Sequence, residues 1–271
     1  MDDIDRFLLE DLNQIGDITS DALFTNEQVT GTIIAKEYCV VAGLEEANIV
    51  FMRLGAVVTM HVRDGEEVQP KTRIATVNGS ARSILKAERL ALNFLGRMSG
   101  IATTTKSLVE RCRLINPNVT IAATRKTTPG FRTYEKKAVR LGGGEPHRYG
   151  LYDAILIKDN HIKIAGSVSE AIQRMEKNNV HRTIEIEVEN EEDALIAAAH
   201  NVDVIMLDNF SAEQAQKTTQ KIRQHHSKIL IEISGGITPE NIIQYAPFAD
   251  RISLGYLTHS IKNKDFSMEL Q

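Results

Sequence analysis

Basic side chains follow two short runs of the 271-residue chain that are rich in apolar residues. Arg125 and Lys126 come directly after VTIAAT, and Lys158 comes directly after AILI. Parallel α/β folds carry their active sites at the carboxyl ends of the strands, so bases at these places predict a site for an anionic ligand. The alternative is that they form ordinary ion pairs at the rim of a barrel.

Acidic side chains occupy a third run. In TIEIEVEN, Glu185, Glu187 and Glu189 alternate with apolar residues, and the two-residue period of a strand places all three on one face. A parallel strand that is buried on both faces does not hold three acids unless that face is a polar barrel lumen or holds a metal. Asp208 follows the next run, VDVIML, where it could face Glu187. Carboxylates without a His or Cys cage favour Mg²⁺, and the alternative is that they pair with the nearby bases.

Two glycine-containing turns predict a phosphate site. ILIEISGGITPEN reads as a strand, the turn Ser234-Gly235-Gly236, and a helix with Thr238 as N-cap and Pro239 at the first position. A glycine-rich turn before a helix N-terminus binds anions through its backbone N–H groups. ISLGYLTHS places Ser253 and Gly255 at the end of the next strand, where barrels often bind phosphate. The alternative is a plain turn.

The stretch RLGGGEPHRYG contains three consecutive glycines, but its context differs from that of a phosphate cradle. Gly142 falls just after a helix predicted over PGFRTYEKKAVRL, where glycine is the usual left-handed cap. No helix is predicted after the glycines, so the run ends one helix and presents His147 and Arg148. We expect the basic residues of this helix to form an exposed face: Arg132, Lys136, Lys137 and Arg140.

Composition limits the classes of partner. The net charge of −4, the absence of Trp and an aromatic content of 5% argue against nucleic-acid binding. Cys39 and Cys112 lie far apart without metal-site spacing, which indicates a reducing, cytoplasmic setting. The acidic start MDDIDRFLLED argues against a signal peptide, and no apolar run has the length of a membrane span.

The order of the predicted elements indicates the fold class. Strand runs alternate with helical patterns after about residue 101, which predicts an α/β fold with an incomplete (β/α) barrel over 102–259. A doubly wound open sheet is the alternative, but no strand-G-x-G-x-x-G-helix unit is present. Residues 1–101 read as a separate α/β domain whose last helix carries an apolar stripe. We expect the tail, 260–271, to pack on that first domain.

Several motifs, taken together, resemble the quinolinate phosphoribosyltransferase family, the carboxylating nicotinate-nucleotide pyrophosphorylases. They are GDITSDAL, AERLALNFLGRMSGIAT, ATRKTTPGFR, KKAVRLGGGEPHRYGLYDAILIKDNH, IEVEN, MLDNF, ISGGI and ISLGYLTHS. Many members of the family have Asn where this chain has Pro146. The resemblance implies an N-terminal α/β sandwich, an incomplete seven-stranded α/β barrel, and assembly as a homodimer or a hexamer of dimers.

The resemblance also implies a reaction and a set of roles. Quinolinate and 5-phosphoribosyl 1-diphosphate react with Mg²⁺ to give nicotinate mononucleotide, diphosphate and CO₂, a step of NAD biosynthesis. The residues that resemble the quinolinate-binding set are Arg125, His147, Arg148 and Lys158, together with Arg89, which would act in the neighbouring subunit's site. Those that resemble the diphosphate, ribose and metal positions are Lys126, Glu187 and Asp208. Those that resemble the 5′-phosphate loops are Ser234, Gly235, Ser253 and Gly255, with His259 close by.

Three other functions fit parts of the sequence. Lys158 at a strand end would suit a Schiff-base aldolase. A related family associated with molybdenum transport shares the ATRKT-like and GGG-HR elements, although LIKDNH favours the quinolinate enzymes. The hairpins of VRDGEEVQPKTRIATVNG are similar to those of lipoyl-type carrier domains, but the turn lysine of such domains is absent.

Overall fold

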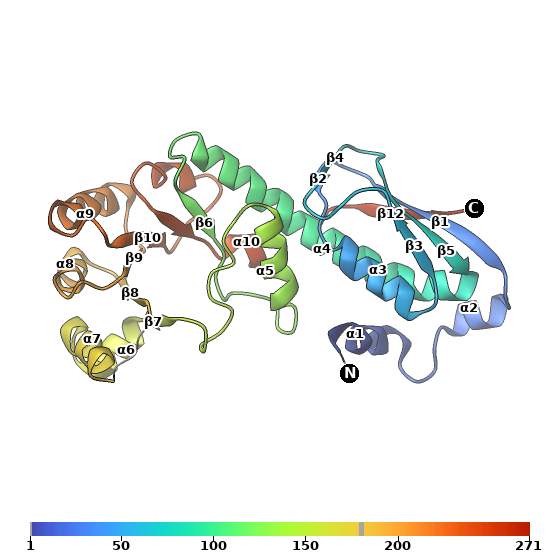
Figure 1. The fold of residues 1–271 in the computed structure, drawn as a ribbon, viewed down its shortest axis with the longest axis horizontal. Coiled ribbons are helices and arrows are strands. Elements are labelled where there is room, and N and C mark those ends of the chain that lie inside the picture. The colour runs from blue at the N-terminus through green and yellow to red at the C-terminus, as the bar shows by residue number, and fades with distance from the viewer. Residues whose placement is uncertain (1, 179–181) are drawn as a thin grey trace. The chain divides into compact units, whose positions relative to one another are not determined.

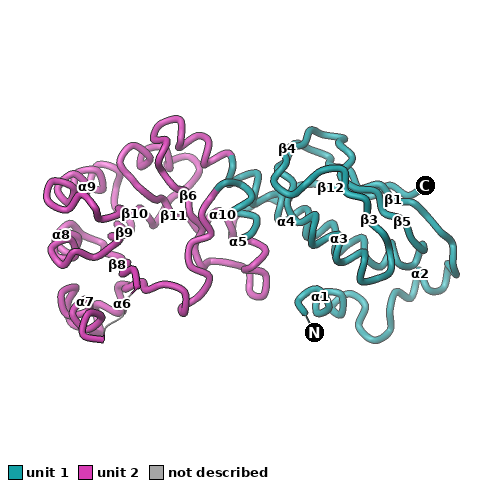
Figure 2. Tube along the Cα trace, in the orientation of Figure 1, with its two compact units in different colours: residues 1–106, 137–143, 261–271 teal, residues 107–136, 144–260 magenta. Residues whose placement is uncertain are grey.

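The computed structural model describes residues 2–178 and 182–271 and divides into two compact units, which Figure 2 distinguishes by colour. Unit 1 contains the residues up to 106 together with 137–143 and 261–271, and unit 2 contains 107–136 and 144–260. Helix α4 (Ala81–Arg113) has residues in both units. It therefore continues without a break through residue 101, near which the sequence analysis places a domain boundary.

Unit 1 is built on a four-stranded antiparallel sheet with the order β12-β1-β5-β3. The C-terminal tail supplies β12, which pairs with β1 from Gly31 opposite Leu270 to Ala35 opposite Phe266. The bounds of the elements of this unit are α1 (Asp3–Leu12), α2 (Ile18–Leu23), β1 (Gln28–Ala35), β2 (Cys39–Val40), α3 (Leu44–Arg53), β3 (Val57–Met60), β4 (Glu67–Val68), β5 (Arg73–Ser80) and β12 (Phe266–Leu270).

Unit 2 is an α/β unit around a six-stranded parallel sheet with the order β6-β11-β10-β9-β8-β7 (Figure 1). This arrangement confirms the predicted α/β class. The bounds of its elements are β6 (Thr120–Ala122), α5 (Arg132–Leu141, whose last residues belong to unit 1), β7 (Ile155–Ile157), α6 (Asp159–Ala165), α7 (Val168–Lys177), β8 (Ile184–Val188), α8 (Glu191–Ala199), β9 (Val204–Asp208), α9 (Ala212–His225), β10 (Leu230–Ser234), the short 3₁₀ helix η1 (Ile242–Gln244), β11 (Arg251–Ser253) and α10 (Tyr256–His259).

All six predicted strand runs of this unit form strands. Most of their apolar residues are buried, as in β9, where the first four residues are all buried. Helices on the outside of the sheet cover one face, so an apolar run without alternation is stable here. The residues at the carboxyl ends of the strands are more polar, and they are the ones that form the site.

The seventh strand implied by the resemblance is not formed in the part of the chain that the structure describes. Its place beside β6 is held by an isolated parallel bridge between Ala122 and Glu145, whose backbone groups exchange hydrogen bonds with Ile121 and Ala123 at 2.8 and 2.9 Å. Pro146 has no N–H to continue the ladder, and His147 has a φ of 54°. The expectation of seven strands is therefore wrong for the described residues, because the chain leaves the sheet at Pro146.

Two of the three glycines at 142–144 are required for different structural reasons. Gly143, not Gly142, has the left-handed backbone that ends α5, with a φ of 82°. Gly142 is needed because a Cβ there would lie 2.4 Å from the carbonyl oxygen of Ala102 on α4. The glycine run thus ends the helix as predicted, but the capping position moves by one residue.

No helix in the described ranges is long and apolar enough to cross a membrane.

Candidate active site

A pocket of about 770 Å³ lies at the carboxyl ends of the parallel strands of unit 2. Each of the six strands contributes a residue at or beside its end. All predicted site residues except Arg89 line it: Arg125, Lys126, His147, Arg148, Lys158, Glu187, Asp208, Ser234, Gly235, Ser253, Gly255 and His259. The fold therefore gathers side chains that are separated by up to 134 residues in the sequence into one cavity.

Arg89 lies elsewhere. It belongs to the part of α4 in unit 1, where its side chain is exposed. Its predicted role concerns a second copy of the chain.

Two guanidinium groups, those of Arg125 and Arg148, form the most basic part of the pocket. Within residues 2–178 and 182–271, no carboxylate lies within ion-pairing distance of either one. Burial and the neighbouring charge of Arg125 together lower the pKa of Arg148, although Glu185 and Glu187 act in the opposite direction. Two cations that repel each other in a pocket favour a ligand with two negative charges, and guanidinium forks match carboxylates geometrically.

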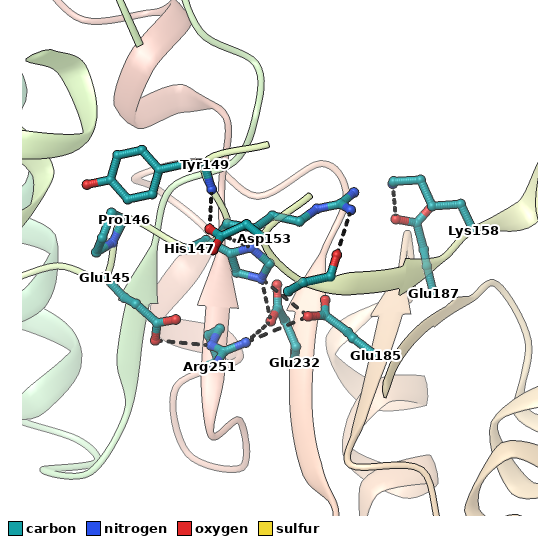
Figure 3. A network of polar contacts seen from close by, with 12 residues as sticks. Glu145, Pro146, His147, Tyr149, Asp153, Lys158, Glu185, Glu187, Glu232 and Arg251 are labelled. Atoms are coloured by element: carbon teal, nitrogen blue, oxygen red, sulfur yellow. Dashed lines mark hydrogen bonds and ion pairs between the residues drawn. The ribbon is translucent and has the colours of Figure 1, made fainter. Parts of the chain in front are cut away.

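A buried charge cluster lies around Glu232 in the barrel lumen (Figure 3). The Nε2 atom of His147 is 3.4 Å from Glu185 and 3.5 Å from Glu232. A guanidinium nitrogen of Arg251 lies 2.9 Å from Glu232 and 3.9 Å from Glu185, and its Nε lies 3.2 Å from Glu145. The cluster therefore connects strands β8, β10 and β11 to the bridge and the loop that carry Glu145 and His147.

The charges in this cluster depend on one another. Burial alone would lower the pKa of His147, but the carboxylates of Glu185 and Glu232 outweigh it and raise the pKa to about 9. Burial and the charge of Glu232 raise the pKa of Glu185. Burial also acts to raise the pKa of Glu232, but His147 and Arg251 overcome it and the pKa is lowered. Glu232 is thus the permanent anion around which the two cations gather.

The backbone N–H of Arg148 donates a hydrogen bond of 2.8 Å to Nδ1 of His147. This bond requires an unprotonated Nδ1, so it belongs to the neutral ring, with its proton on Nε2 toward the carboxylates. A second proton on Nδ1 would displace the bond. The protonation state of His147 is therefore coupled to the backbone of Arg148.

His147, Glu185 and Glu232 also form a group of three potential metal ligands among the described residues. The guanidinium of Arg251 already supplies a positive charge to both carboxylates of this group. Both carboxylates are also buried, whereas Mg²⁺ in proteins usually keeps several of its waters. We therefore assign the group to an ion-pair cluster and expect a metal site elsewhere in the pocket.

Glu187 and Asp208 fit a magnesium ion better. Both line the pocket on neighbouring strands, and both offer the carboxylate oxygens that Mg²⁺ prefers when substrate phosphates and water complete its shell. The amide of Asn209 orients Asp208 by a hydrogen bond of 2.7 Å. Glu189, predicted to share the face of Glu187, instead lies beyond the end of β8 and is exposed.

Lys158 lies between β7 and α6, and its ammonium group contacts the carboxylate of Glu187. A Schiff-base lysine must attack as a neutral amine, whereas this lysine is placed as the cation of an ion pair. The geometry therefore does not support the aldolase alternative. It leaves Lys158 available to a second anion in the pocket.

The predicted phosphate turns also line the pocket. Gly235 and Gly236 have φ values of 78° and 62°, and a Cβ at Gly235 would lie 2.3 Å from the side chain of Asn209. The prediction of a helix that begins at Thr238 is wrong, because Pro239 starts a turn that leads only to the short 3₁₀ helix η1. Any anion here would be bound by the turn itself and not by a helix N-terminus.

Gly255 is needed for a close approach between two other site residues. A Cβ at this position would lie 2.8 Å from the ring of His259 and 3.0 Å from Cδ of Lys126. The hydroxyl of Thr258 donates a hydrogen bond of 2.7 Å to the carbonyl of Lys126. The strand end after β11 therefore holds Lys126 beside Ser253 and His259.

The predicted exposed basic face of α5 is largely wrong. Lys136 has an exposed fraction of 0%, and Arg132 donates hydrogen bonds to Thr127 and to the carbonyl of Tyr149. Lys137 contacts Glu45 and Glu46, so only Arg140 is fully exposed. The helical period correctly predicts a helix, but it does not show which face of that helix the loops of the barrel cover.

Several contributors were not identified from the sequence. Glu232 interrupts the apolar run KILIEI in the same way that Glu185 interrupts TIEIEV, so an acid inside a buried strand was an available signal. Arg251 begins the next strand and gave no such signal. Its role depends on which strands are neighbours in the sheet.

Comparison with known proteins agrees with this geometry. The families described as quinolinate phosphoribosyl transferase, C-terminal domain, and quinolinate phosphoribosyl transferase, N-terminal domain, match residues 101–269 and 17–99. The chain is 43% identical over 258 residues to a probable nicotinate-nucleotide pyrophosphorylase [carboxylating] of Archaeoglobus fulgidus, covering 94% of this chain and 98% of that protein. It is 38% identical to the human nicotinate-nucleotide pyrophosphorylase [carboxylating], covering 87% and 80%.

Solved structures of nicotinate-nucleotide pyrophosphorylases are also similar to this chain. The nicotinate-nucleotide pyrophosphorylase from Francisella tularensis superposes with a TM-score of 0.92 at 37% identity, covering 99% of this chain and 94% of that chain. A more distant structure, the nicotinate-nucleotide pyrophosphorylase from Pyrococcus furiosus, shares the fold with a TM-score of 0.74 at 16% identity.

The charge cluster predicts how His147 titrates. Its pKa is raised from an ordinary value near 6.5, so its contribution to stability is complete below about pH 6.5 and is lost as the pH rises through about 9. Glu232→Gln should move the pKa of the His147 ring back toward 6.5, because one of its two anionic partners is removed. Ring resonances followed by NMR and urea unfolding between these pH values would measure both effects.

Glu189→Gln is the matched control, since Glu189 is an exposed acid just beyond the same strand as Glu185. It should leave the His147 titration unchanged. An unaltered His147 pKa in Glu232→Gln would contradict the assigned cluster.

Proposed function

The chain belongs to the quinolinate phosphoribosyltransferase family, and we propose that the pocket of unit 2 performs the family's reaction. The enzyme transfers the phosphoribosyl group of 5-phosphoribosyl 1-diphosphate to quinolinate, with loss of CO₂. The product is nicotinate mononucleotide, which enters NAD biosynthesis. The observation that carries the assignment of the site is the pair of guanidinium groups, Arg125 and Arg148, without carboxylate partners among the described residues.

Quinolinate is a pyridine with two adjacent carboxylates, so its charge complements this part of the pocket. Arg125 and Arg148 would each bind a carboxylate by a two-pronged hydrogen bond, and Lys158 would add a point charge. His147, whose pKa is raised to about 9, would add a positive charge beside Arg148. Glu185 and Glu232 are buried beside His147.

The phosphoribosyl donor would occupy the other part of the pocket. Ser234, Gly235, Ser253 and Gly255 would hold its 5′-phosphate, and His259 lies beside them. Lys126 would bind the diphosphate, whose negative charge grows as the bond to the ribose carbon breaks. Positive charge develops on the sugar at the same time, and Glu187 and Asp208 would stabilise it through the ribose hydroxyls or through bound metal.

We propose Mg²⁺ as the metal, held by Glu187 and Asp208. When bound, it would neutralise the charge of the leaving diphosphate. The support for this assignment is the hard oxygen donor set and its position between the two parts of the pocket. Loss of CO₂ then follows from the cationic ring nitrogen formed by the transfer, since that nitrogen stabilises the electron pair left on the adjacent carbon. The carbon then takes up a proton.

We also propose a homodimer or a hexamer of dimers, in which Arg89 reaches the pocket of a second copy. Arg89 is exposed and does not line the pocket of its own chain. A third basic group from another chain would complete the charge around a dicarboxylate. A cytoplasmic location accords with two free, buried cysteines.

The reaction is tested directly with purified protein. Quinolinate, 5-phosphoribosyl 1-diphosphate and MgCl₂ should yield nicotinate mononucleotide, and chelation of the metal should abolish its formation because the diphosphate charge is then uncompensated. Chromatography of the products measures both. Absence of product, with nicotinate accepted in place of quinolinate, would refute the proposed function.

Arg148→Ala separates the two halves of the pocket. It removes a charged hydrogen-bonding group from the quinolinate end, so the KM for quinolinate should rise by about ten- to a hundredfold. The KM for the phosphoribosyl donor should change much less. Steady-state kinetics with each substrate varied in turn gives both values, and equal losses for both would contradict the role of Arg148.

A mixing experiment tests whether sites are shared between chains. At a quinolinate concentration near the wild-type KM, Arg89→Ala and Arg148→Ala should each lose most of their activity, because each removes one base from every pocket. Mixed dimers would contain some pockets with both arginines, so part of the activity should return. No recovery in dimers shown by mass spectrometry to be mixed would argue against sharing.

A further inference from the structure

The first turn of α5 contacts both loops that carry the predicted quinolinate-binding residues, although none of its own residues lines the pocket. One loop follows β6 and carries Arg125 and Lys126. The other follows the bridge at Glu145 and carries His147 and Arg148. Both loops and this turn belong to unit 2.

Arg132 bridges the two loops. Its Nε donates a hydrogen bond of 2.9 Å to the hydroxyl of Thr127, and one of its terminal nitrogens donates a bond of 2.9 Å to the carbonyl of Tyr149. The rigid, planar guanidinium fixes the distance between its two acceptors. A side chain with a single donor group could not hold both at once.

Glu135 holds the loop that follows β6. It has an exposed fraction of 0% and accepts hydrogen bonds from the backbone N–H of Thr128 at 3.1 Å and from its hydroxyl at 3.0 Å. A buried carboxylate is stable only when such bonds satisfy it. These two bonds therefore fix the loop immediately after Arg125 and Lys126.

Lys136 holds the loop that follows the bridge at Glu145. Its ammonium group donates to the carbonyl of Pro146 and lies 5.4 Å from the centre of the Tyr149 ring. These contacts are on either side of His147 and Arg148.

The burial of Lys136 is costly, which makes a purely structural purpose a poor explanation. Burial and the charges of Arg132, Arg125 and Arg148 lower its pKa to about 8, and only Asp153 acts in the opposite direction. An apolar side chain of the same length would avoid this cost. The charge is retained at a place where it adds to the field of the arginines and holds the loop between them.

Building on the proposed function, we propose that Arg132, Glu135 and Lys136 are positioning residues that fix the two basic loops at the spacing required by a pyridine dicarboxylate. Lys136 acts on the His147–Arg148 loop only, and Arg132 acts on both loops. The effect of each residue on ligand binding should follow the loop that it contacts.

Two variants of the full-length protein test this assignment by calorimetric titration with quinolinate and, separately, with 5-phosphoribosyl 1-diphosphate and MgCl₂. Lys136→Met should weaken quinolinate binding by at least about tenfold, as expected for loss of a charged hydrogen bond that orients the loop, and change donor binding by less than about twofold. Arg132→Met should weaken the binding of both ligands, because Lys126 lies on the loop that it also holds.

Lys137→Met is the matched control. Lys137 is the next residue on the same helix, but its contacts are with Glu45 and Glu46 in unit 1. It should lower the melting temperature without altering either affinity. Tyr149→Leu removes the other contact of Lys136 and should reproduce the selective loss of quinolinate affinity, which keeps the proposal testable if Lys136→Met does not fold.

The outcomes are distinct. If Lys136→Met and Tyr149→Leu bind quinolinate as tightly as the wild type, or lose affinity for both ligands in parallel with a fall in melting temperature, the positioning role is refuted. If the wild-type protein itself does not bind quinolinate, the proposed function has failed instead.

Discussion

The geometry of the pocket depends on the ion-pair cluster of the barrel lumen. Glu232 is inaccessible to solvent and compensated by Arg251 and His147, which come from a neighbouring strand and from the loop after the bridge. A buried carboxylate that loses one partner is strongly destabilised, so the cluster keeps its members in place. Arg148 follows His147 directly and is therefore held at the pocket by the ion pairs that His147 makes with Glu185 and Glu232.

The chain reaches this arrangement by interrupting regular structure. A continuous seventh strand would place residues 146–149 in a sheet ladder, with alternate side chains facing away from the pocket. Pro146 and the positive φ of His147 prevent that ladder, at a cost of about 1–2 kcal/mol for a non-glycine residue in this conformation. Strain of this kind is common where side chains must be presented to a ligand, and here the cluster and Lys136 compensate for it.

The chemistry of the pocket changes along the sheet in the order of the strands. Strands β6 and β7, at the two edges of the sheet, precede the basic residues Arg125 and Lys158, whereas β10 and β11 end in the small residues Ser234 and Ser253. The acids Glu187 and Asp208 come from the strands between. In strand order, Arg125 is therefore next to the small residues suited to a phosphate, and the carboxylates suited to a metal and a ribose lie between those residues and Lys158.

The strands of unit 2 and most of the pocket residues could be predicted from the sequence, because apolar runs specify strands and parallel strands bring their carboxyl ends together. The family resemblance then supplied roles for residues such as Arg148 and Ser234. The sequence did not determine the seventh strand position, the turn after Pro239 or the burial of Lys136. Each of these depends on which groups meet in the packed structure. A helical period shows that Lys136 and Arg140 lie on one surface of α5. Only the packed structure shows that Pro146 and Tyr149 cover Lys136, whereas Arg140 is exposed to solvent.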